Sequence, residues 1–157
     1  MNDRDMKFLR AAFAAAQRAR EHGNHPYGAV LVLENGEILL EAENTVITER
    51  DCTGHAETNL VREASRRFEP SVLSKCAVYA SAEPCAMCAG AIYWSGARRL
   101  VYGLSKQRGS AWMQDKAAHP QLRAGCHEIL ATGERVIDVQ GPALEEEAEL
   151  VHKDYWQ

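Results

Sequence analysis

Residues 76–102 have the sequence CAVYASAEPCAMCAGAIYWSGARRLVY, which predicts a strand, a helix and a second strand. Residues 76–81 are the expected buried strand, and residues 85–94 are apolar enough for a buried helix whose first turn tolerates Pro84. Residues 100–102 then form another short strand. Because strands joined through a helix require a crossover connection, the stretch predicts an α/β fold with helices packed against a sheet.

A helix and a hairpin are predicted on the N-terminal side of this stretch. Residues 3–20 carry apolar side chains at helical spacing. Residues 28–33 and 38–41 are apolar runs, and the Asn35-Gly36 pair between them is a strong hairpin signal. We therefore expect an N-terminal helix, then two antiparallel strands, and hence a mixed sheet.

The C-terminal side gives a weaker pattern. Residues 129–130 and 136–139 are expected to form one interrupted strand or two. Gly141-Pro142 precedes a last expected helix over residues 143–155, with an acidic outer face.

Length and composition indicate one domain over residues 1–157. The hydrophobic fraction of 46% and the charged fraction of 25% are typical of a soluble globular protein with a substantial core. The apolar run at residues 11–16 is far too short to span a membrane. Five cysteines, an odd number that includes one C-x-x-C, favour a reducing compartment over a disulfide framework, so we expect a cytoplasmic protein.

The charge balance favours a small-molecule substrate. Lys and Arg total 18 against 22 for Asp and Glu, and a net charge of -4 disfavours a polyanion such as tRNA. Five arginines could still form a local basic patch, although a solvated surface is the simpler interpretation: Arg62, Arg66, Arg67, Arg98 and Arg99.

Two motifs place metal-binding side chains at the starts of helices. His55-Ala56-Glu57 stands where residues 56–68 are predicted to form a helix, and Cys85 and Cys88 lie on one face of the first turn of the helix at 85–94. The positive end of a helix dipole favours thiolates over thiols. One imidazole and two thiolates suit zinc and leave its fourth tetrahedral position for water.

Glu57 is the candidate catalytic residue. Zinc lowers the pKa of a bound water from about 15.7 to roughly 7, which makes it a nucleophile near neutral pH. The Glu57 carboxylate, two residues from the candidate ligand His55, can take the proton of that water and deliver it elsewhere. The motifs therefore predict a hydrolytic zinc site.

Two other interpretations of the cysteines stay open. A thioredoxin-like redox site would explain Cys85 and Cys88 but not the His-Ala-Glu triplet. A structural zinc site would need a fourth ligand, and Cys52, Cys76 or Cys126 could provide it, although none has a partner at C-x-x-C spacing. Small buried side chains are the simpler interpretation of these three.

Together the motifs resemble those of the cytidine deaminase superfamily, the zinc-dependent nucleobase deaminases. The resemblance runs from the first helix to about Leu104 and includes residues 26–30, Asn44, the His-Ala-Glu triplet and residues 83–92. Within the superfamily the chain is most similar to bacterial guanine deaminases and tRNA adenosine deaminases, with fungal cytosine deaminases a little further off. The resemblance implies a three-layer α/β/α sandwich with a five-stranded mixed sheet, one zinc ion per chain and a homodimer.

The resemblance also implies roles for the residues around the zinc. Glu57 would pass the proton of the water to the ring nitrogen and later protonate the departing ammonia. The implied substrate contacts are the Asn44 amide, the backbone N–H of Ala56, the Tyr27 ring, the carbonyl groups of Ala82 and Glu83, the Asp115 carboxylate and the Trp156 ring. The alternatives are a turn role for Asn44, core packing for Tyr27 and Trp156, and a solvated Asp115.

Guanine is the substrate that the resemblance favours. An acid at Asp115 could accept from the ring N–H groups of guanine, whereas acidic residues near the C-terminus would repel the phosphates of tRNA. A tRNA adenosine, or cytosine or a nucleoside, is the alternative substrate, and an inactive zinc-binding subunit is the non-enzymatic alternative. The aromatic tail could close its own site or a partner's.

Overall fold

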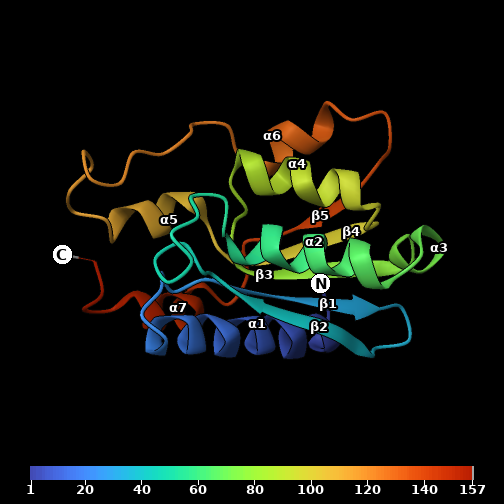
Figure 1. Ribbon diagram of the computed structural model, residues 1–157, viewed down its shortest axis with the longest axis horizontal. Helices are drawn as coiled ribbons and strands as arrows, with labels where there is room; N and C mark the ends of the chain where they lie inside the picture. Colours follow the sequence, from blue (N-terminus) through green and yellow to red (C-terminus); the bar gives the residue numbers. More distant parts are fainter. Residues whose placement is uncertain (157) are drawn as a thin grey trace.

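The computed structural model describes residues 1–156 and contains a five-stranded sheet with helices on both faces (Figure 1). The strands are β1 (Gly28–Leu33), β2 (Ile38–Glu43), β3 (Cys76–Ala82), β4 (Arg99–Leu104) and β5 (Asp138–Gln140), arranged in the order β2-β1-β3-β4-β5. β1 is antiparallel to β2 and β3, whereas β3, β4 and β5 run parallel. The predicted mixed sheet is confirmed.

The helices form two layers on opposite faces of the sheet (Figure 1). One face is covered by α1 (Asp3–Glu21) with α7 (Glu145–Ala148) beside it, and the other by α2 (Ala56–Arg67), α4 (Ala86–Ser95) and α6 (Cys126–Ala131). The remaining short elements are α3 (Pro70–Leu73), α5 (Lys106–Ala111) and the 3-10 helix η1 (Glu149–His152). Among residues 1–156, no helix is long and apolar enough to cross a membrane.

Helix α1 lies very close to the sheet because the residues between them are small. Its inner face carries fully buried alanines, including Ala16 and Ala19, and a methyl group at Gly28 of β1 would overlap the backbone of Ala16. The Asn2 side chain caps the helix by accepting from the Asp5 backbone N–H, at 3.1 Å. These contacts make α1 a firmly seated element.

Helix α4 matches the prediction to within one residue at each end. Cys85 is its N-cap, and Gly96 ends it with a φ of 88°, a left-handed conformation that favours glycine. The chain then enters β4 directly, which completes the predicted strand–helix–strand unit.

Two expectations for the C-terminal part are wrong. Residues 129–130 belong to helix α6, because Cys126 and Leu130 are buried four residues apart, which is helical spacing, so β5 is a single strand. The expected helix over residues 143–155 is broken into α7 and η1. It does not continue because the Arg20 side chain binds the carbonyl groups of Val151 and Lys153, and the Tyr155 N–H bonds back to His152 instead of Val151.

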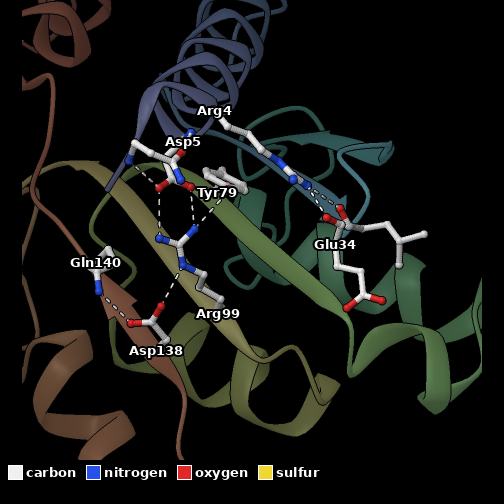
Figure 2. A network of polar contacts seen from close by, with 9 residues as sticks. Arg4, Asp5, Glu34, Tyr79, Arg99, Asp138 and Gln140 are labelled. Atoms are coloured by element: carbon white, nitrogen blue, oxygen red, sulfur yellow. Dashed lines mark hydrogen bonds and ion pairs between the residues drawn. The ribbon is translucent and has the colours of Figure 1, made fainter.

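A buried ion pair connects α1 to strand β4, and through it to β5 (Figure 2). The Arg99 guanidinium donates to both oxygens of Asp5, at 2.6 and 3.1 Å, and to Asp138 at 2.9 Å. The Tyr79 hydroxyl donates to Asp5 at 2.7 Å. Arg99, expected on a solvated surface, is instead part of a network that links α1, β3, β4 and β5.

Candidate metal centre

Three side chains from two adjacent helices converge beyond the ends of the central strands. His55 is the N-cap of α2, Cys85 is the N-cap of α4, and Cys88 lies in the first turn of α4. The His55 Nδ1 atom is 3.5 Å from each cysteine Sγ, and all three ligand atoms lie within 4.8 Å of one another. Within residues 1–156, this cluster has no fourth His, Cys, Asp or Glu ligand.

The spacing of these atoms fits a tetrahedral zinc ion. Zinc–sulfur and zinc–nitrogen bonds of about 2.3 and 2.0–2.1 Å at a tetrahedral angle place the nitrogen and sulfur atoms about 3.6 Å apart. The observed separations of 3.5 Å agree with that value. Cys52 is exposed, and Cys76 and Cys126 are buried outside the cluster. The geometry therefore favours a site with three protein ligands over a closed structural site.

The two thiols share a negative charge. Hydrogen bonds from Cys88 and His55 lower the pKa of Cys85 to about 4, although burial opposes the shift. Because Cys85 takes the charge first, the pKa of Cys88 is raised, and its sulfur lies 3.2 Å from the Thr58 hydroxyl. The hydrogen bond to Cys85 also raises the pKa of His55. Such an anionic pair is suited to binding a cation.

Glu57 lies in the first turn of α2, close to the cysteines, and is 7% exposed. Burial raises the pKa of its carboxyl to about 7, and the charge of Cys85 adds to the shift. A carboxyl with that pKa exchanges a proton readily at neutral pH, as a proton carrier must. The structure thus brings Glu57 together with the three candidate ligands.

A group of aromatic side chains covers the space next to these residues. Tyr27 follows the loop before β1, and the charges of Glu57 and Cys85 add to the effect of burial in raising its pKa. The Trp156 ring lies 6.2 Å from the Tyr27 ring and is stacked on His25 at 5.2 Å, measured between ring centroids. Trp156 is 7% exposed, so the end of the tail is packed against Tyr27 and His25 of its own chain.

Asn44 and Ala56, two further predicted substrate contacts, are buried. Asn44 is buried, its backbone N–H donates to the Tyr27 carbonyl group at 3.0 Å, and its side-chain oxygen accepts from Val46. Ala56, just after His55, is fully buried in the first turn of α2. The Asn44 and Ala56 contacts with substrate stay predictions.

The carboxylates of Glu83 and Asp115 accept hydrogen bonds from backbone N–H groups. Glu83, next to Ala82 at the end of β3, accepts from the backbone N–H groups of Lys106 and Cys126. Asp115 is exposed and accepts from Ala117 and Ala118, three residues or fewer along the chain. The contact of the Asp115 carboxylate with substrate stays a prediction.

Three histidines around the aromatic tail were not predicted. His25 and His119 pack against Trp156, His152 accepts a hydrogen bond from the Trp156 ring, and the Tyr155 hydroxyl lies 3.0 Å from His25. Isolated histidines carry no motif, so only the clustered aromatic residues at the tail could have pointed to this group.

Comparisons with known proteins agree with this geometry. A family model described as the cytidine and deoxycytidylate deaminase zinc-binding region matches residues 2–104. The chain is 39% identical over 156 residues to a probable cytosine deaminase of Schizosaccharomyces pombe, covering 99% of this chain and 94% of that protein. It is 40% identical over 103 residues to a tRNA-specific adenosine deaminase of Aquifex aeolicus, covering 65% and 68% of the two chains.

Two solved structures share the fold. A guanine deaminase from Nitrosomonas europaea has a TM-score of 0.79 at 24% identity, over 94% of this chain and 82% of that one. A guanine deaminase from Bacillus subtilis has a TM-score of 0.61 at 35% identity, over 71% and 69%. The proteins similar to this chain thus include three substrate classes.

Proposed function

The chain belongs to the cytidine and deoxycytidylate deaminase zinc-binding family and is a zinc-dependent hydrolytic deaminase, and we propose that it acts on a free nucleobase. We further propose that His55, Cys85 and Cys88 hold one zinc ion. The observation that carries this assignment is the tetrahedral spacing of the three ligand atoms beside a buried carboxylate.

Glu57 performs the proton transfers in the proposed reaction. When bound, zinc makes water a nucleophile near neutral pH, because it lowers the pKa of that water to about 7. Glu57 accepts a proton from the attacking water and gives it to the ring nitrogen of the base. It then takes the second proton from the hydroxyl group that has been added to the ring carbon and gives it to the amino group. The carbon–nitrogen bond breaks, the ring carbon keeps a carbonyl oxygen, and ammonia is released. Burial raises the pKa of the Glu57 carboxyl, which suits it to both the acceptor and the donor role.

The covering tail supports a free base as substrate. Trp156 is buried against His25 and Tyr27, a tail position that we expect to favour a small planar ring over a nucleotide within an RNA. The chain carries a net charge of -4, and the segment leading to the tail contains Glu145, Glu146, Glu147 and Glu149. Arg10 pairs with Glu147, and Arg108 pairs with Glu145 and Glu149. The net negative charge of the chain is therefore what opposes the approach of a phosphate backbone.

Guanine is the base that we propose first, because the solved relatives of this fold include guanine deaminases, one of them 35% identical to this chain. The exposed Asp115 adds no support to that choice. Cytosine is the second candidate, since the similarity to the Schizosaccharomyces pombe protein extends over 99% of this chain.

A substrate panel with a matched pair of variants tests the proposal. We expect the zinc-loaded protein to release ammonia from guanine, and Glu57→Gln to lose at least about 100-fold in turnover, the lower end of what a general acid–base contributes. Its zinc content, measured by metal analysis, should stay near one ion per chain.

Glu63→Gln is the control on the same helix, because Glu63 is half-exposed and pairs with Arg67 on the surface. It should keep full activity. Release of ammonia from cytosine alone would select the second candidate. Activity only on tRNA, or full activity of Glu57→Gln, would contradict the proposal.

A further inference from the structure

After η1 the tail changes direction sharply and reaches Tyr27, the aromatic residue close to Glu57 and Cys85. Lys153 is extended, and Asp154 adopts a left-handed conformation with a φ of 60°. This turn brings Tyr155 and Trp156 back toward β1, where Tyr155 meets His25 and Trp156 packs between His25 and His152. The position of both rings therefore depends on what holds residues 151–153.

Arg20 holds these residues. Its Nη1 atom donates to the Val151 carbonyl oxygen at 2.8 Å and to the Lys153 carbonyl oxygen at 2.6 Å. Its guanidinium group also lies over the Tyr155 ring, 5.6 Å from the centroid. One side chain thus contacts the backbone on both sides of His152 and the first aromatic residue of the tail.

Helix α1, which carries Arg20, is held firmly against the sheet. Arg20 stands in the last turn of α1, next to the fully buried Ala19, and α1 lies against β1 too closely to shift without disturbing the sheet. Hydrogen bonds from a charged group are stronger than neutral ones, so the two bonds from Arg20 are a substantial part of what holds the tail.

We propose that Arg20 is a positioning residue for the deaminase reaction: it fastens residues 151–153 so that Tyr155 and Trp156 stay closed over the bound base. Arg20 acts through the tail and contacts neither the metal cluster nor Glu57. This inference rests on the proposed function, because the tail covers a base only if the site binds one. With Arg20 removed, the tail samples open positions. The apparent affinity for the base then falls in proportion to the fraction of time that the tail is closed.

The test compares Arg20→Ala with Arg20→Lys and with Arg18→Ala. Arg18 is the matched control, since it lies in the same last turn but makes a surface ion pair with Glu41. Amide hydrogen exchange of residues 149–156 reports the tail directly, and exchange of residues 8–16 reports whether α1 stays folded. Ammonia release gives KM and kcat separately.

Arg20→Ala should speed exchange of the tail at least about tenfold and raise KM at least about tenfold, with kcat changed much less, because the open fraction of the tail multiplies directly into binding. Arg20→Lys, which keeps the charge but offers a single ammonium group, should fall between Arg20→Ala and the wild type. Arg18→Ala should stay within about twofold of the wild type in both measurements, as expected for a surface pair.

Unchanged tail exchange in Arg20→Ala would overturn the inference, as would an unchanged KM in an active enzyme. Faster exchange throughout α1 as well would show that Arg20 merely supports the fold, and would also overturn it. If the wild-type protein releases no ammonia from any base, the proposed function fails, and the proposed role in the reaction fails with it. Tail exchange would then still decide whether Arg20 fastens the tail.

Discussion

Asp5 is a carboxylate with 1% exposure that remains charged in the folded protein. Burial alone would raise its pKa, but the hydrogen bonds from Arg99 and Tyr79 outweigh burial and lower the pKa to about 2. Removing Arg99 would leave this charge buried without its main partner, which is more costly than losing an exposed ion pair.

We therefore expect Arg99→Ala to lower the free energy of unfolding by about 3 kcal/mol at pH 7. The exposed neighbour Arg98 is the control. Arg98→Ala should change the free energy of unfolding by no more than about 0.5 kcal/mol. Urea denaturation followed by circular dichroism measures both.

The pH dependence gives this prediction a second check. Because the pKa of Asp5 is lower in the folded state, its contribution is fully present above about pH 4 and is lost as the pH falls toward 2. The difference between the wild type and Arg99→Ala should shrink over that range. A difference that is independent of pH would contradict the role of the ion pair.

At the scale of an element, η1 and the tail make stability depend on pH through His152. This side chain is 1% exposed, and burial, helped by the charge of Arg20, lowers its pKa to about 4. The folded protein therefore keeps His152 neutral, while the unfolded chain takes up a proton near the ordinary pKa of 6.5.

The free energy of unfolding should consequently fall by at most about 3 kcal/mol between pH 6.5 and pH 4 on account of His152. His152→Gln, which can still accept from Trp156, should flatten the dependence in this window. His22→Gln, at an exposed histidine, should not. Equal slopes for the wild type and His152→Gln in urea denaturation would show that His152 is not the responsible group.

The elements also show what could be predicted from sequence. The metal cluster was predictable because its ligands stand at the starts of two helices, where capping position and C-x-x-C spacing are local properties. The hairpin and the strand–helix–strand unit followed from local patterns in the same way. The path of the tail was not predictable, because it depends on Arg20, a residue 131 positions before Val151.

At the scale of the whole molecule, we propose that two copies associate through α4. This helix is apolar along almost its entire length, and it leaves Trp94, in its last turn, 84% exposed. A large exposed aromatic residue on such a helix is typical of an interface anchor.

Light scattering should give twice the mass of the chain. Trp94→Glu should weaken the association at least about tenfold, as expected for an anchor residue. Val136→Glu is the control, since Val136 is 90% exposed and lies outside α4. A monomeric mass for the wild type would contradict the proposal.

The bond between Arg20 and the tail joins residues much farther apart in the sequence than the candidate metal ligands are. The candidate ligands are separated by at most 33 positions, so they can meet while the chain is still being synthesised. Arg20 must wait for carbonyl groups 131 and 133 positions later, which is a contact of high loop-closure cost. We therefore expect the residues of the metal cluster to meet before the tail is fastened.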